Sequence, residues 1–167
     1  MSKVLIIDTS ILCVYLKVPF MEECGPDDDK WDYDRVAEKI DSEIQKNSLL
    51  VLPLAALIET GNHIAHAPGD RYPLAKNLSD IIVKAATAEE PWAAFTAQKD
   101  LWGEENLKKL ANEWPALAAA DVSIGDATIK DVAEFYTQFC VSVEILTGDK
   151  GLKAYEPKVV KVPRRRR

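Results

Sequence analysis

The stretch Lys3-Val-Leu-Ile-Ile-Asp-Thr-Ser-Ile-Leu12 places a carboxylate at the end of a short apolar run. Four consecutive aliphatic residues, at positions 4–7, are typical of a strand that is buried on both faces, as in parallel sheets covered by helices. Asp8 stands where this strand stops. In open parallel sheets, ligands bind beyond the carboxyl ends of the strands. The stretch therefore predicts a buried first strand with a functional aspartate at its end.

Short aliphatic runs alternate with helical patterns along the rest of the chain. The expected strands cover residues 3–7, 49–53, 143–146 and 158–162. The expected helices cover residues 9–17, 34–45, 54–67, 74–88, 104–113 and 125–139. Residues 18–31 are expected to form a loop, and residues 89–122 show a poor pattern outside 104–113. Alternation of this kind predicts an α/β fold with a parallel sheet.

The length and composition indicate one globular unit. With 167 residues, 47% of them hydrophobic, the chain can bury a sizeable core in one domain, expected over residues 1–163, followed by a basic tail at 164–167. No apolar run approaches the roughly 20 residues of a membrane span, and the N-terminal pattern is not that of a signal peptide. We therefore expect a cytoplasmic protein with no membrane partner.

Charge is unevenly distributed along the chain. The formal net charge is −6, and residues 22–34, with seven acids and one lysine, carry −6 by themselves. The four C-terminal arginines, residues 164–167, can neutralise nucleic-acid phosphates or form a solvated tail. The acidic balance therefore does not exclude a nucleic-acid substrate. The three cysteines are widely spaced and form no C-x-x-C pair, which argues against a zinc site.

Four acidic residues follow expected strands or lie on the helices beside them. They are Asp8, Glu59, Asp126 and Asp149. Neighbouring strands would bring them to one edge of the sheet, where carboxylates a few ångströms apart repel unless a cation joins them. Oxygen ligands suit hard cations such as Mg²⁺, which can position a water and stabilise the charge developing on a phosphodiester. The cluster therefore predicts that Asp8 ends its strand there to hold a metal ion such as Mg²⁺.

Four stretches resemble the acidic motifs of the PIN-domain family, in the order found in that family. They are VLIIDTSIL (4–12), LPLAALIETGNHI (52–64), SIGDATIKDVAEFY (123–136) and VEILTGDKGLKAY (143–155). The resemblance implies a three-layer α/β/α sandwich with a central, mostly parallel sheet. It also implies a Mg²⁺- or Mn²⁺-dependent endoribonuclease, which in many small bacterial and archaeal members is a toxin.

The resemblance also implies site residues and partners. It assigns the four carboxylates Asp8, Glu59, Asp126 and Asp149 to the catalytic metal site, and it assigns Ser10 and Thr147 to hydroxyl positions that orient the metal ligands. RNA is the implied substrate. A neutralising antitoxin protein is the implied partner of a toxin, and a second copy of the chain in a homodimer is a further candidate partner.

Each carboxylate also has a structural interpretation. Asp8 can be a helix N-cap, Glu59 a solvated helix residue, Asp126 a helix-start residue and Asp149 part of a turn. The third metal ligand must be chosen among Asp121, Asp126 and Asp131. The apolar stripe Ile129, Val132, Ala133, Tyr136 and Cys140 should pack on the sheet. It places Asp126 at the flank of that stripe and predicts that Asp131 faces solvent.

Rival functions remain open at the level of the sequence. A non-catalytic PIN module would bind RNA or a protein without cleaving. An aspartyl-phosphate enzyme would use Asp8 as nucleophile, but Ser10 stands where such enzymes need a second acid. Glu59, His63 and His66 share one helix face at a spacing that suits a transition metal, yet no further zinc ligands are evident.

Overall fold

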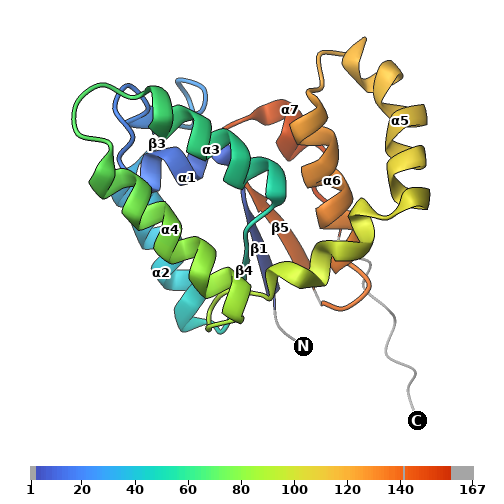
Figure 1. Cartoon of the computed structure of the whole chain (residues 1–167), viewed down its shortest axis with the longest axis horizontal. Helices are drawn as coiled ribbons and strands as arrows, with labels where there is room; N and C mark the ends of the chain where they lie inside the picture. The colour runs from blue at the N-terminus through green and yellow to red at the C-terminus, as the bar shows by residue number, and fades with distance from the viewer. Residues whose placement is uncertain (1–2, 141, 159–167) are drawn as a thin grey trace.

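A three-stranded parallel sheet lies at the centre of the protein (Figure 1). The computed structural model describes residues 3–140 and 142–158. The strands are β1 (Lys3–Ile7), β4 (Leu49–Val51) and β5 (Ser142–Leu146), in the spatial order β4-β1-β5. Both neighbours run parallel to β1, with Val4 opposite Leu49 and Val143. The predicted α/β class with a parallel sheet is confirmed, although the sheet is small.

Helices make up most of the described chain. They are α1 (Thr9–Tyr15), α2 (Tyr33–Gln45), α3 (Leu54–His66), α4 (Tyr72–Thr87), the 3-10 helix η1 (Phe95–Trp102), α5 (Glu104–Ala118), α6 (Ile124–Tyr136) and α7 (Lys150–Lys153). A separate antiparallel hairpin pairs β2 (Glu23–Cys24) with β3 (Trp31–Asp32). Within residues 3–140 and 142–158, no helix is both long and apolar enough to span a bilayer.

The side chains of β1 divide between two hydrophobic cores because successive residues of a strand point to opposite faces. Leu5 and Ile7 join the core formed with α1, α2, α3 and α4. Val4 and Ile6 join the core formed with β5 and α6. Both faces of the sheet are therefore covered, which explains why β1 is a continuous aliphatic run. This arrangement is compatible with an α/β/α sandwich.

Several element boundaries differ from the sequence-based expectations. The strand expected at 49–53 ends at Val51, and the helix expected at 104–113 continues to Ala118. The loop expected at 18–31 contains the hairpin β2–β3, whose strands of two residues are too short to show an alternating pattern. Of the strand expected at 158–162, only Lys158 lies within the described residues, where it is not in a strand. The basic tail 164–167 lies outside them.

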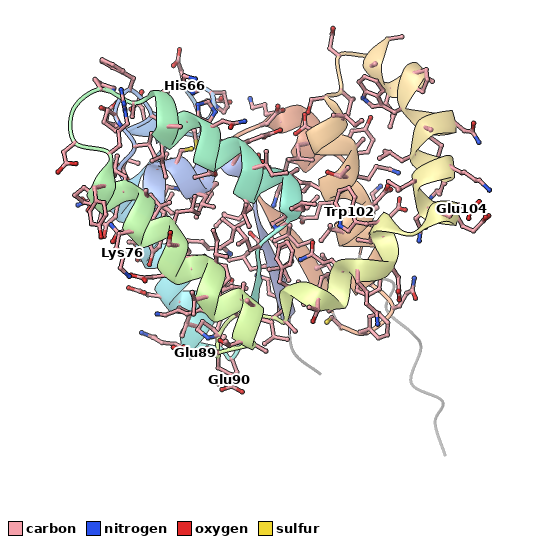
Figure 2. All side chains as sticks on the ribbon, in the orientation of Figure 1. His66, Lys76, Glu89, Glu90, Trp102 and Glu104 are labelled. Atoms are coloured by element: carbon pink, nitrogen blue, oxygen red, sulfur yellow. The ribbon has the colours of Figure 1, made fainter. Side chains whose placement is uncertain are left out.

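The aromatic-rich part of segment 89–122 joins the edge of the sheet rather than forming a separate unit. Trp92 makes a parallel bridge with Leu50, and Ala93 N donates to Leu50 O at 2.8 Å. The buried Gln98 donates from Nε2 to Leu52 O at 3.0 Å, which ties η1 to the end of β4. Next along the chain, η1 ends at Trp102 and α5 begins at Glu104, and both residues are labelled in Figure 2. These contacts join residues far apart in sequence, so local periodicity does not reveal them.

An ion-pair network neutralises the acids at the amino end of β1. Glu43 of α2 is 3% exposed and accepts from Lys3 at 2.7 Å, Lys39 at 2.8 Å and Ser48 at 2.7 Å. Both lysines also pair with Glu144 of β5. Burial by itself would raise the pKa of Glu43, but these hydrogen bonds outweigh it and lower the pKa to about 2. The network therefore stabilises the packing of α2 against β1 and β5.

We predict that Glu43→Gln lowers the free energy of unfolding by about 3 kcal/mol at neutral pH, because it leaves two partly buried lysines to share Glu144. The ordinary pKa of 4.5 falls to about 2 on folding, so the contribution of Glu43 is fully present above pH 4.5. It should be lost as the pH falls toward 2. Urea unfolding across this pH range would measure the difference.

The exposed Glu38, on the same helix, provides the control. Glu38→Gln should change stability by less than about 0.5 kcal/mol. Equal losses for the two variants would show that the network contributes nothing beyond ordinary surface charge.

Candidate functional site

The carboxyl ends of β1 and β5 meet at Asp8 and Thr147. The register sets Ile7 opposite Leu146, and Asp8 N donates to Leu146 O at 3.0 Å. The next residue of β5, Thr147, then donates from Oγ1 to Asp8 Oδ2 at 2.8 Å. Parallel pairing of the two strands thus delivers a carboxylate and a hydroxyl to one point at the edge of the sheet.

The Asp8 side chain is held by other side chains and does not cap α1. It occupies the N-cap position of α1, yet its side chain makes no capping hydrogen bond. Instead, Oδ2 accepts from Ser10 Oγ and Thr147 Oγ1, each at 2.8 Å. The residue is only 5% exposed. The helix-cap interpretation of Asp8 is therefore confirmed for its position but not for its side chain, and the structure places both predicted hydroxyl residues on this carboxylate.

The same two hydroxyls also fix the turn that follows β5. Ser10 Oγ accepts from Gly148 N at 3.1 Å, and Thr147 Oγ1 accepts from Asp149 N at 2.9 Å. Each hydroxyl therefore donates to Asp8 and accepts from the turn. This closed set of bonds links the start of α1 to the residue that carries the fourth predicted carboxylate.

Glu59 is anchored between α1 and α6. Its Oε2 accepts from Thr9 Oγ1 at 2.7 Å. A Cβ atom built on Gly125 would lie 2.3 Å from Glu59 Oε1, so a larger residue there would displace the end of this side chain. Glu59 is half-buried rather than freely solvated. Thr9 and Gly125 belong to the site but were not recognised from the sequence; the signal was their position beside predicted ligands, Asp8 and Asp126.

Asp126 lies in the first turn of α6, where the N-cap Ser123 accepts from its backbone N–H at 3.0 Å. Burial raises the pKa of Asp126, hydrogen bonds from Ser123 lower it, and the negative charges of Asp8 and Asp149 raise it. The net shift is upward. Asp126 is therefore both a helix-start residue and a carboxylate within electrostatic reach of two other predicted ligands.

Asp149 combines a structural role with its position near the site. Its Oδ1 caps α7 by accepting from Gly151 N at 2.6 Å and Leu152 N at 3.3 Å. The residue is exposed. The turn interpretation of Asp149 is thus confirmed for one carboxylate oxygen, and its Oδ2 takes no part in the cap.

The negative charges of the four predicted carboxylates have no ion-pair partner among the described residues. Among the ion pairs within 4.0 Å that the described residues form, none involves Asp8, Glu59, Asp126 or Asp149. In Asp8, Glu59 and Asp149, one oxygen is engaged by protein donors as described above, which leaves the other oxygen for a further partner. Oxygen donors without a compensating lysine or arginine are the chemistry that suits a hard cation.

The described residues contain no group of three or more His, Cys, Asp or Glu side chains arranged so as to hold a metal ion. Mg²⁺, however, usually keeps several waters and binds through one or two carboxylates plus substrate phosphates. The donor set of the site therefore fits such an ion, although it does not form a closed protein cage.

Two other predictions about acids and histidines can be compared with the structure. Asp131 was expected to face solvent, but it is half-buried, and burial raises its pKa. The expectation was wrong because residues of α5, η1 and α6 line an open surface pocket together with Asp131. His63 and His66 are exposed, and His66 lies at the outer end of α3, away from the sheet (Figure 2).

Comparisons with protein-family models, with curated proteins and with solved structures found no match to this chain. An assignment of function therefore rests on the residues and contacts described above.

We predict that Asp126→Asn raises the melting temperature in EDTA at neutral pH by about 2 °C, because it removes a half-buried charge near two like charges. The folded-state pKa of Asp126 lies above its ordinary value of 3.8, so the native protein is disfavoured as the pH rises through that range. The gain should vanish below pH 3.8, where the carboxyl group is protonated in both states. A lower melting temperature at neutral pH would show that Asp126 acts only through the start of α6.

Proposed function

We propose that this protein is a PIN-like endoribonuclease that hydrolyses RNA phosphodiesters with the help of Mg²⁺ or Mn²⁺. One observation carries the proposal. The buried Asp8 has Oδ2 fixed by Ser10 and Thr147, and the pKa of Asp126 is raised first by burial and then by the negative charges of Asp8 and Asp149, which lie far from it in the sequence. A folded chain gains no stability from such repulsion, and perturbed acids in a cluster are typical of functional sites.

The fold supports the proposal in outline. The three parallel strands have covered faces, and the four predicted carboxylates follow β1 and β5 or lie on α3 and α6, as the resemblance to the PIN family implies. A three-layer α/β/α sandwich of the PIN type is therefore the architecture we propose. Ligands of open parallel sheets bind at this edge.

Asp8, Glu59, Asp126 and Asp149 would hold the metal, directly or through water. When bound, Mg²⁺ or Mn²⁺ would activate a water and offset the charge that develops on the phosphodiester. Ser10 and Thr147 orient Asp8 by donating to Oδ2, which leaves Oδ1 for a further partner. Thr9 performs the corresponding task for Glu59 by donating to Oε2. Protein hydroxyls thus fix which carboxylate oxygens remain available.

The role of a toxin neutralised by an antitoxin follows from the family resemblance and is part of the same proposal. It would make a small protein partner necessary in the cell, and it places the protein in the cytoplasm with its RNA substrate. A gene for a short protein directly beside that of this chain would support this role.

One observation favours a second candidate, a non-catalytic module that binds RNA or protein. No three side chains of the described residues are placed to hold a metal ion. A non-catalytic module would need no such group. The two candidates differ in a simple measurement, since only the enzyme requires a divalent cation for turnover.

We predict that single-stranded RNA is cleaved in the presence of Mg²⁺ or Mn²⁺ and not in EDTA. Asp8→Asn should lower the cleavage rate by at least about 100-fold, because the amide oxygen can still accept from Ser10 and Thr147 while the NH₂ group cannot bind a cation. The folded structure should persist for the same reason. Cleavage of a fluorescent RNA and thermal unfolding, measured on the same samples, would test both statements.

The exposed Asp41 of α2 provides a matched control, because Asp41→Asn makes the same chemical change away from the site. It should leave the rate unchanged. Full activity of the native protein in EDTA would contradict the metal-dependent mechanism, and RNA binding without cleavage under all metal conditions would favour the non-catalytic module.

A further inference from the structure

The hairpin β2–β3 rests directly on the turn that precedes Asp149. A Cβ atom on Gly148 would lie 2.7 Å from Cys24 Sγ and 2.7 Å from Gly25 N, so the turn has no room for any side chain at this position. The acidic segment, residues 22–34, is therefore not a free surface loop. Cys24 and Gly25, near its start, pack against the turn that precedes Asp149.

The shape of the hairpin is also fixed internally. Gly25 has a positive φ of 91°, and a Cβ atom there would lie 2.4 Å from Asp29 O. The segment can therefore turn back on itself tightly only with glycine at this position. This turn carries the aspartates that follow Gly25 to the side of the candidate site.

The packed hairpin brings Asp28 to Lys150, the residue that follows Asp149. Lys150 Nζ lies 3.1 Å from Oδ1 and 3.4 Å from Oδ2 of Asp28, so both carboxylate oxygens face the ammonium group. The side chain of Lys150 is 67% exposed and that of Asp28 is 76% exposed. Exposed ion pairs contribute little to stability, so this contact can be exchanged for another at small cost.

A phosphate group presents the same kind of partner to a lysine as this carboxylate does: negatively charged oxygens that accept from an ammonium group. We propose that Lys150 binds a phosphate of the substrate strand beside the cleavage site, and that Asp28 occupies this position until RNA displaces it. The inference rests on the proposed function and adds a substrate-binding residue and a competing carboxylate to it.

The chain offers a neighbouring aspartate that separates a local contact from a general charge effect. Asp27 is fully exposed and lies 3.6 Å from Lys30 rather than close to Lys150. Removing either aspartate changes the net charge of the acidic segment by the same amount. Only removal of Asp28 frees Lys150.

The experiment measures the affinity of a short fluorescent single-stranded RNA across a range of salt concentrations, in the presence of Mg²⁺. An Asp8→Asn background prevents cleavage. In that background, Asp28→Asn should tighten binding by about fivefold. Asp27→Asn should change it by less than about twofold at physiological salt, because distant exposed charges are screened.

The second part of the experiment uses the variant Lys150→Gln. It should weaken binding and reduce the slope of log affinity against log salt by about 0.7, the value for one phosphate contact on a single strand. Combined with Lys150→Gln, Asp28→Asn should no longer tighten binding. Because both side chains are exposed, thermal unfolding should be unchanged in all four variants.

The outcomes separate this inference from the proposed function. Equal effects of Asp28→Asn and Asp27→Asn, or an unchanged affinity for Lys150→Gln, would overturn the role of Lys150 while leaving a ribonuclease intact. Absence of RNA binding by every variant and by the parent chain would overturn both.

Discussion

The hydrogen bonds from Ser10 and Thr147 to Asp8 Oδ2 are the interaction on which the candidate site depends. The bond from Thr147 can form only because β5 pairs in parallel with β1 in a register that brings Thr147 beside Asp8, whereas Ser10 reaches Asp8 from two residues further along the chain. The same hydroxyls accept from Gly148 and Asp149, so they set the turn as well. A shift of the register by one residue would exchange the faces of β5 and separate Thr147 and the following turn from Asp8 and Ser10.

The acids at the two ends of the sheet have pKa shifts in opposite directions. At the amino end, Glu43 and Glu144 share Lys3 and Lys39, and the pKa of Glu43 falls to about 2. At the carboxyl end, burial and neighbouring negative charges raise the pKa of Asp126. The first arrangement stabilises the fold. The second is destabilising by itself, which is why a cation-dependent function is the interpretation we favour.

Sequence patterns within a single strand or helix predicted the features that depend on that element alone. The aliphatic run of β1 identified a doubly covered strand, and the helical stripe from Ile129 to Tyr136 identified the buried face of α6. The exposure of Asp131 was misjudged, because it depends on α5 and η1 packing nearby, which the sequence of α6 does not encode. The hairpin and its contact with Gly148 were missed for a related reason, since tertiary packing holds two-residue strands in place.

The central claim is that Asp126 belongs to a metal-binding site rather than only to the start of a helix. Calorimetric titration with Mn²⁺ of the native protein, Asp126→Asn and Asp131→Asn tests it most directly. Asp131 is a matched control, because it lies on the same helix and its pKa is also raised by burial. The account predicts Mn²⁺ binding by the native protein and by Asp131→Asn, and none by Asp126→Asn. Equal binding by all three proteins, or binding by none of them, would contradict it.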